Sequence, residues 1–437
     1  MTIARISIST FQKKTNPVIV LAFLLLVSVY ESSAQSTSVD LEYRFNPTYS
    51  RGFRQPLYAG EKAGFFTQQR TRLILNYNNP DSLKAQVILQ DRRAWGEITE
   101  RADVAEVSIF RAWLEKSFRN DFSLKLGRQG LVYDDQHIFG ELNWGGTLAH
   151  DLALGKYEKG TFKAHLGLAV NANRVNELKR DLFQPNIYKN MQFLYLSKKW
   201  DKQRSSLWLV NHGLEQADTT VAYTQTFGSN TSVPIGGKLK FTGVFFQQIG
   251  RDATDRKVNA SFLSLQLLLK SSSKWSFSLG LDKMSGTDLQ NLTDPGAKSS
   301  TYNILFGLRH GRFGYLDYFY LLIDPVFGLQ DYYAKIDYTP SSRLRIRNNV
   351  HFFQTDANAY AAADIAYANP LDSFLGVEND LTLRYSVAKD FNVTLGHSIM
   401  FGSNTLDEMF GGVPSRENQF FYAVIVATPR IFQKKSE

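Results

Sequence analysis

The 437-residue chain contains no cysteine. This absence excludes a disulfide framework, a metal site built from thiolates, and a lipid anchor attached through an N-terminal cysteine. The fold therefore depends on hydrogen bonding and packing alone.

Long apolar runs are also scarce. After residue 34, no uninterrupted apolar stretch approaches the roughly 20 residues that a membrane-crossing helix needs. Before it, Lys13 and Lys14 precede a short apolar stretch at residues 18–29, and the small residues 32–34 follow. This order is typical of a secretory signal peptide, so we predict that residues 1–34 are removed by cleavage before Gln35.

Acidic residues are the minority, and the formal net charge of the whole chain is +9. Removal of residues 1–34 takes away three basic residues and one acidic residue, which leaves about +7. A basic exported protein favours anionic solutes, acidic polysaccharides or lipopolysaccharide phosphates as partners. Nucleic acid is disfavoured, because the chain has no run rich in lysine and arginine.

Alternation of apolar and polar residues dominates the rest of the chain. In the segment 343–352, Leu344 and Ile346 share one face of an extended strand, whereas Arg345 and Arg347 share the other. An amphipathic helix would not sort these residues in this way. Similar runs begin near Arg70, Leu83, Phe122, Phe162, Met191, Leu207, Val221, Leu239, Trp275, Tyr332, Leu375, Phe391 and Phe420.

Turn signals separate these runs. Short turns at residues 158–160, 199–202, 271–273 and 339–342 are expected as periplasmic hairpins, and longer polar stretches at 173–186, 250–256, 285–298, 355–372 and 403–418 as extracellular loops.

The segments number about 18, with an uncertainty of about two, and a barrel of that size leaves an aqueous lumen. We therefore predict an all-β fold, a transmembrane antiparallel β-barrel spanning residues 35–437 in the outer membrane. The composition also suits a soluble β-sandwich or β-propeller, although no short repeat supports a propeller.

Two regions resemble the alginate-export family of outer-membrane barrels. The first, residues 70–151, contains the motifs Val87-Ile88-Leu89-Gln90-Asp91-Arg92-Arg93, Leu124-Lys125-Leu126-Gly127-Arg128-Gln129, Tyr133-Asp134-Asp135-Gln136, Gly140, Asn143-Trp144 and Asp151. The second runs from His310 to the C-terminus, with Gly314-Tyr315-Leu316-Asp317-Tyr318-Phe319, Gly328-Leu329-Gln330-Asp331, His351-Phe352-Phe353-Gln354 and Leu375-Gly376-Val377-Glu378.

The resemblance implies a monomeric barrel of about 18 strands whose lumen narrows to an arginine-rich constriction interleaved with carboxylates. By matching position, it implies Arg128 and Asp151 as lumen residues. The family pattern usually has an arginine shortly before this aspartate, whereas residues 145–150 of this chain contain none. Alginate itself therefore stays an open question.

Arginine is suited to an anion-selective pore, because it remains protonated and offers planar donors to carboxylates and phosphates. Arg92 lies in the first resembling region. Parity places six further arginines on the polar faces of their strands: Arg70, Arg72, Arg111, Arg345, Arg347 and Arg384. The alternative is that these arginines pair with Glu115, Asp337, Glu378 and Asp380 and brace the wall.

Enzymatic signals are weak. His397 and Ser398 are adjacent, and neighbours on a strand point to opposite faces, so they do not form a catalytic pair. The histidines lack the spacing of a zinc motif, and the aspartates lack a complete calcium loop. We expect no catalytic residue, metal site or cofactor.

The sequence predicts an outer-membrane channel that passes anionic or saccharide-like solutes, with an alginate-type polyuronate as one candidate. Its expected partners are outer-membrane lipids, lipopolysaccharide, the solute and periplasmic export proteins. Two alternatives stay open: a non-specific diffusion porin, and a barrel hydrolase that acts on lipid.

Overall fold

A computed structural model describes residues 35–58, 60–79, 82–97, 107–118, 121–141, 148–171, 188–216, 218, 220–293, 296–319, 326–410 and 418–435. The predicted signal peptide, the Asn143-Trp144 motif and the predicted loop 173–186 lie outside these ranges.

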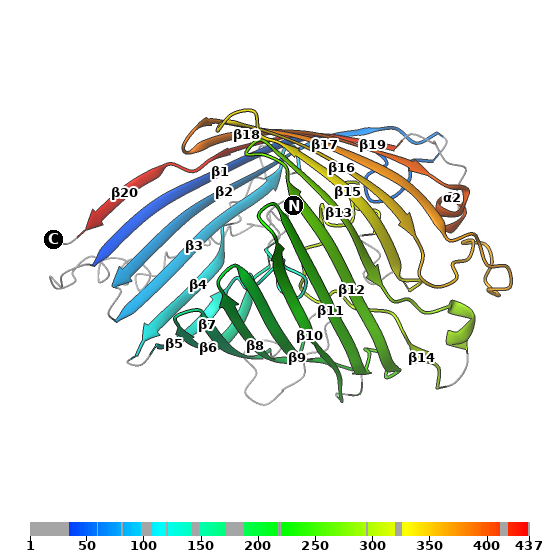
Figure 1. Ribbon diagram of the computed structural model, residues 1–437, viewed down its shortest axis with the longest axis horizontal. Helices are drawn as coiled ribbons and strands as arrows, with labels where there is room; N and C mark the ends of the chain where they lie inside the picture. Colours follow the sequence, from blue (N-terminus) through cyan, green and yellow to red (C-terminus); the bar gives the residue numbers. More distant parts are fainter. Residues whose placement is uncertain are drawn as a thin grey trace, which may run out of the picture.

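The described residues form a closed antiparallel barrel of 18 strands, which confirms the predicted fold (Figure 1). The strands are β1 (Ser36–Arg51), β2 (Gly64–Asn79), β3 (Leu83–Ala94), β4 (Ser108–Ser117), β5 (Phe122–Gln129), β6 (His150–Lys159), β7 (Phe162–Val170), β8 (Asn190–Trp200), β9 (Gln203–Glu215), β10 (Val221–Ile235), β11 (Leu239–Arg251), β12 (Lys257–Lys270), β13 (Trp275–Met284), β15 (Leu329–Tyr338), β16 (Leu344–Gln354), β17 (Phe374–Ala388), β18 (Phe391–Gly402) and β19 (Asn418–Ala427).

Closure occurs where the last strand meets the first. β19 pairs with the second half of β1, and β20 (Arg430–Lys435) continues the same line along the first half of β1. Residues 428–429 interrupt this last strand, and the amide of Leu41 donates to the carbonyl of Pro429 across the gap. β19 and β20 thus act as one strand of the barrel wall.

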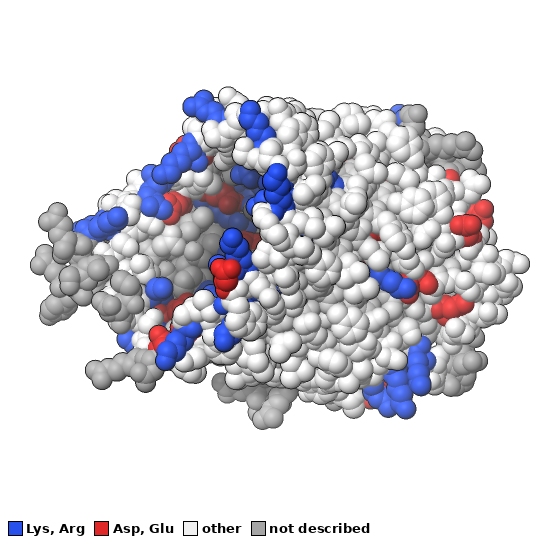
Figure 2. All heavy atoms as spheres, viewed as in Figure 1, with Lys and Arg blue, Asp and Glu red and all other residues white. Residues whose placement is uncertain are grey.

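The alternation read in the sequence sets which side chains face out. In β9, Leu207 and Leu209 are 57% and 50% exposed, whereas Trp208 and Val210 are 5% and 0% exposed. An apolar outer face and a filled inner face are what lipid on one side and a lumen on the other require. On the face shown in Figure 2, the middle of the barrel has few charged side chains.

The two ends of the barrel differ. The predicted short turns join β6 to β7, β8 to β9, β12 to β13 and β15 to β16, and they lie at the end that holds the start of β1 and the end of β20 (left in Figure 1). The long connections lie at the opposite end, with η1 (Leu289–Thr293), β14 (Lys298–Ser299) and α2 (Asn404–Phe410). Within the described ranges, no helix combines the length and the apolar character needed to cross a membrane.

Two of the long connections fold inward. We call residues 130–141, between β5 and β6, inner loop 1, and residues 299–319, before β15, inner loop 2. They pair with each other through a bridge between Phe139 and Phe306, whose rings stack with centroids 5.6 Å apart. The amide of Gly140 also donates to the carbonyl of Phe306 at 2.9 Å. The lumen is therefore partly filled, whereas the strand count alone had suggested an open aqueous channel.

Inner loop 1 is anchored to the wall by Asp134. Its carboxylate accepts hydrogen bonds from Tyr195 Oη at 2.9 Å, Ser206 Oγ at 2.6 Å and Trp208 Nε1 at 3.1 Å, and it pairs with Arg204 at 2.7 Å. These partners come from the inner faces of β8 and β9. The Tyr133–Gln136 motif of the family resemblance thus fastens an inner loop.

Inner loop 2 is anchored by Glu378 on β17. Its Oε1 accepts from the amide of Leu316 at 2.8 Å, in the fully buried inner face of the wall. Gly314 has φ +81°, and a Cβ there would lie 2.3 Å from Glu378 Oε2, so the approach requires glycine. The amide of Arg54 donates to the carbonyl of Leu316 at 2.8 Å, which ties the same loop to the β1–β2 connection.

A candidate anion site on the inner wall

Five arginines lie together on the inner face of β1–β4. Cross-strand register places Arg44 directly opposite Arg70, and Arg70 directly opposite Arg92. Residues directly opposite each other in an antiparallel pair share a face, so these three guanidinium groups form a row. Arg72 on β2 and Arg111 on β4 stand beside it. We call Arg44, Arg70, Arg72, Arg92 and Arg111 the arginine ladder.

Carboxylates contact three arginines of this ladder in the described part of the chain. Glu42 Oε1 accepts from Arg70 Nη2 at 2.7 Å and from Arg72 Nη1 at 3.4 Å. Glu141, from inner loop 1, accepts from Arg111 Nη2 at 2.7 Å. Among the described residues, these contacts place one carboxylate between Arg70 and Arg72 and another against Arg111.

Phe110 separates two members of the ladder. The pairing of β3 with β4 shifts between Ile88 and Leu89, which leaves Phe110 as the extra residue of a β-bulge. Its ring lies 4.4 Å from the Arg72 guanidinium and 4.9 Å from that of Arg111. Cation–π contacts of this kind hold guanidinium groups in place without neutralising them.

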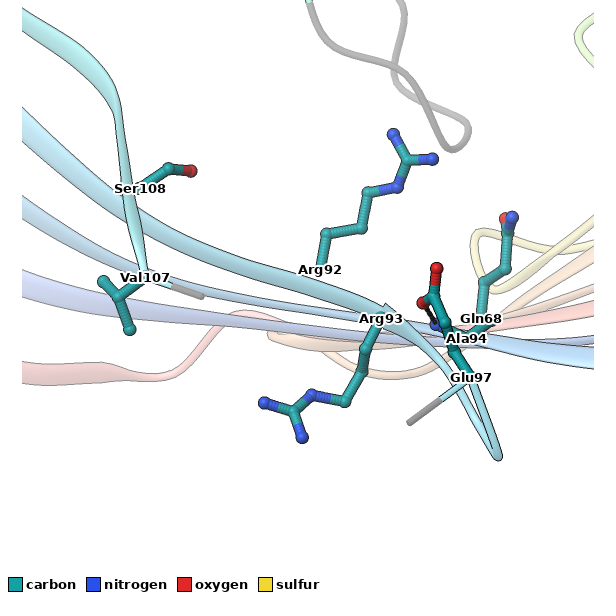
Figure 3. Close-up of a pocket in the computed structure, with 7 residues that line it drawn as sticks. All are labelled: Gln68, Arg92, Arg93, Ala94, Glu97, Val107 and Ser108. Carbon is teal, nitrogen blue, oxygen red and sulfur yellow. Dashed lines mark hydrogen bonds between the residues drawn. The ribbon is translucent and has the colours of Figure 1, made fainter. Parts of the chain in front are cut away.

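Arg92 is the exposed member of the ladder. Figure 3 shows that Arg92 and Arg93 point to opposite sides of β3, and that Arg92 lies on the same side as Gln68 and Ser108. A cavity of about 510 Å³ surrounds this end of the strand. Arg93 pairs with Asp91 at 3.0 Å, whereas Arg92 has no ion pair with any described residue.

The three arginines near the C-terminus form a separate group. Arg345 and Arg347 both donate to Asp337, at 2.7 and 2.8 Å, close to the short-turn end. For these two residues, the contacts agree with the alternative that the arginines pair with carboxylates and brace the barrel wall. Arg384 lies directly opposite Arg345 and is exposed. The register thus places this group at the short-turn mouth rather than in the ladder.

Arg128 and Asp151 do form a pair, at 2.7 Å, but on the outer face of the barrel. Arg128 lies opposite Ala112 on β4 and opposite Asp151 on β6, and it is two residues along the strand from the outward-facing Leu126, so it shares that face. Their side chains are 43% and 56% exposed. The lumen position implied by the family motif is therefore wrong, because a shift of one residue along a strand moves a side chain to the other face. Gln129 and His150, the next residues, are the inward pair.

Glu115, Glu378 and Asp380 were also considered as partners of the arginines, but their described contacts are with other residues. Glu115 pairs with Lys156, and Glu378 holds inner loop 2. Asp380 lies 3.8 Å from His351, which itself contacts Asp331 at 2.9 Å. Arg44 and Glu42 were not predicted as lumen residues, although the polar residues Asp40, Glu42, Arg44 and Asn46 occupy alternate positions along residues 36–51.

His137 of inner loop 1 adds little charge. Burial lowers the pKa of His137 well below its usual value, and the positive charge of Arg312 lowers it further. The ring is therefore neutral at neutral pH. On β18, Ser398 is 1% exposed, and His397 stacks on the outward-facing Phe421 with centroids 4.0 Å apart. The described part of the chain holds no cluster of three or more histidine, aspartate or glutamate side chains that could bind a metal ion.

Comparison with known protein families decides the classification. A family model described as alginate export matches residues 39–416. The chain belongs to the alginate-export family. A comparison with curated proteins finds no match.

Solved structures of Pseudomonas aeruginosa proteins share the fold of this family member. OccK9 (OpdG) aligns with a TM-score of 0.60 and 13% identity over 90% of this chain and 98% of its own. OccK2 (OpdF) in complex with glucuronate gives 0.56 and 13% over 91% and 97%, and OpdK with vanillate gives 0.56 and 13% over 91% and 99%. This member of the alginate-export family is an integral outer-membrane channel and not an enzyme, and the lipid hydrolase alternative is set aside.

Proposed function

We propose that this member of the alginate-export family is an anion-preferring channel whose passage runs along the arginine ladder. The inward row of Arg44, Arg70 and Arg92 carries the proposal. Like charges directly opposite each other destabilise a sheet, so this row favours a binding role over bracing.

The electrostatics suit passage rather than capture. A guanidinium and a carboxylate 4 Å apart attract each other by about 1 kcal/mol in bulk water and by about 4 kcal/mol at an effective dielectric near 20. Several such sites in a row let an anion move from one to the next. Partial neutralisation by Glu42 and Glu141 weakens the attraction of an anion to Arg70, Arg72 and Arg111.

The inner loops narrow the passage beside the ladder. Inner loop 1 reaches the ladder through Glu141 and Arg111, and inner loop 2 reaches the β1–β2 connection through Leu316 and Arg54. The ladder strands lie between these two attachments. An anion that crosses the barrel along β1–β4 would therefore pass the guanidinium groups close to both inner loops.

Carboxylated solutes are the substrate class that we propose. Glucuronate and vanillate, named with two structures of the same fold, both carry a carboxylate. Planar guanidinium groups bind carboxylates through paired hydrogen bonds. A polyuronate such as alginate fits this chemistry, as one polymer among several.

The short-turn end supports a route for an anionic polymer from the periplasm. Lysine and arginine side chains gather around the hollow at this end (left in Figure 2). Periplasmic export partners would deliver a polymer there. The barrel closes within one chain, so a single chain suffices to form the proposed passage.

Flux of glucuronate and glucose into proteoliposomes tests the proposal. The native channel should pass glucuronate faster than glucose, and Arg92→Gln should reduce that ratio. Arg93→Gln, one residue along but on the other side of β3, is the matched control and should leave the ratio unchanged. Equal flux of both solutes through the native channel would instead identify a non-specific diffusion porin.

A further inference from the structure

A second cavity, of about 400 Å³, lies at the long-loop end of the barrel, away from the arginine ladder. Its wall comes from the inner faces of β9–β12, and its opposite side from residues 299–305 of inner loop 2. Val258, Leu292 and Leu305 give it apolar surfaces. Asp252, Arg256 and Asn303 give it polar groups.

The cavity is held open by a fixed contact between wall and loop. Gln248 on β11 is 0% exposed, and its Oε1 accepts from the amide of Asn303 at 2.8 Å. Its Nε2 donates to the carbonyl of the same residue at 2.8 Å. This two-way hydrogen bond to the loop backbone sets the width of the cavity before any ligand arrives.

Polar groups around the cavity have unused hydrogen-bonding capacity. Asp252 Oδ1 accepts from the amides of Thr254 and Arg256 in the β11–β12 turn, and no described residue donates to its Oδ2. Asn303 Oδ1 accepts from the amide of Leu305 at 2.7 Å, which leaves its amide nitrogen available. The Arg256 guanidinium makes no ion pair with the described residues.

We propose that this cavity binds a neutral sugar residue of the size of a single pyranose ring. Hydroxyl groups both donate and accept, so they can pair with the donors of Arg256 and Asn303 and with the Asp252 carboxylate. The apolar side chains match the C–H face of a sugar ring. The Asp252 carboxylate would repel a small anion, and the Arg256 guanidinium would repel a small cation. The two opposite charges in the lining therefore favour a neutral ligand.

The size supports one residue rather than a polymer. A cavity of about 400 Å³ lies near the lower end of the roughly 300–1,000 Å³ that is usual for small-molecule sites. The site is separate from the proposed anion path, because its lining residues come from β9–β12 with the β11–β12 turn, from η1, from inner loop 2 and from Val326, and none comes from β1–β4.

Saturation-transfer NMR on the refolded protein in detergent tests this site, with methyl β-D-glucopyranoside as the probe. Arg256→Gln should weaken binding roughly tenfold, since it removes hydrogen bonds from a charged donor. Leu292→Trp should abolish binding by filling the cavity. Arg251→Gln is the matched control, because Arg251 begins the same turn but pairs with Asp255 at 2.8 Å, with both side chains about half exposed.

Normal binding to Arg251→Gln and to the ladder variant Arg92→Gln, with losses in Arg256→Gln and Leu292→Trp, supports the site. Heat-modifiable gel mobility shows that each variant keeps its barrel. The inference is overturned if the folded native protein gives no saturation transfer, if both cavity variants bind as the native protein does, or if methyl β-D-glucuronide binds and the neutral glycoside does not. An equal loss in Arg92→Gln also overturns it, because the signal would then come from the ladder.

Discussion

Arg70 and Arg92 lie directly opposite each other on the inner face of β2 and β3, and Glu42 binds only the first of them. The Arg70 side chain is 4% exposed, whereas Arg92 is exposed. The buried arginine sets a positive potential that its carboxylate only partly cancels, and the exposed arginine presents a charge to solutes. This division of roles gives different expectations for each charged residue around the ladder.

Glu42→Gln should destabilise the barrel and increase its anion preference. The substitution removes the carboxylate between two buried arginines, and loss of one partner from a buried ion pair costs about 3 kcal/mol. Urea unfolding in lipid bilayers measures the first effect, and the reversal potential under a salt gradient measures the second. A variant as stable as the native protein, with weaker anion preference, would show that Glu42 does not hold the ladder.

Gly314→Ala should loosen inner loop 2 and raise single-channel conductance. The added Cβ would meet Glu378 Oε2 at 2.3 Å in a backbone conformation with φ +81°. Gly296→Ala is the matched control, since Gly296 has φ +90° in the same connection but nothing within 4 Å of the added atom. Both variants carry a similar backbone strain, so a conductance change in Gly314→Ala alone isolates the contact with Glu378. Equal conductance in both variants would mean that this contact does not restrict the passage.

Asp134→Asn should release inner loop 1 from the wall. The amide keeps the shape of the carboxylate but loses its charge, which Arg204 contacts at 2.7 Å. Hydrogen bonds to a charged group contribute about 1.5–3 kcal/mol, so the unfolding free energy should fall by about 2 kcal/mol. Limited proteolysis between residues 130 and 141 reports the release directly. Unchanged protection of this segment would contradict the assigned anchor.

Arg128→Gln should leave ion selectivity unchanged. Its side chain pairs with Asp151 on the outer face and is separated from the lumen by the wall. The reversal potential under a salt gradient is the measurement, and the ladder variant Arg92→Gln is the comparison. A loss of anion preference in Arg128→Gln as large as that in Arg92→Gln would show that Arg128 and Asp151 face the lumen after all.

Strand parity predicted the barrel because it is a local property. Each lipid-exposed strand must alternate along its own length, so residues 343–352 already separate Leu344 and Ile346 from Arg345 and Arg347. The same parity grouped Arg70, Arg72 and Arg111 on inward faces, where the register places them.

The inner loops could not be read in this way, because their contacts are distant in sequence. Asp134 reaches Ser206 on β9, and Leu316 reaches Glu378 on β17. No periodicity links such positions. The face occupied by Arg128 was also missed, since the motif matched a position in the chain but not the direction of its side chain. The bulge at Phe110 is a third such feature, because it depends on pairing between β3 and β4.

The reversal potential of the channel in planar bilayers under a potassium chloride gradient tests the central role of the ladder most directly, for the native protein, Arg92→Glu and Arg93→Glu. The ladder predicts that the native channel prefers chloride, that Arg92→Glu loses or reverses this preference, and that Arg93→Glu retains it. A native channel that prefers potassium, or an Arg92→Glu variant with native selectivity, would contradict the arginine ladder as the anion path.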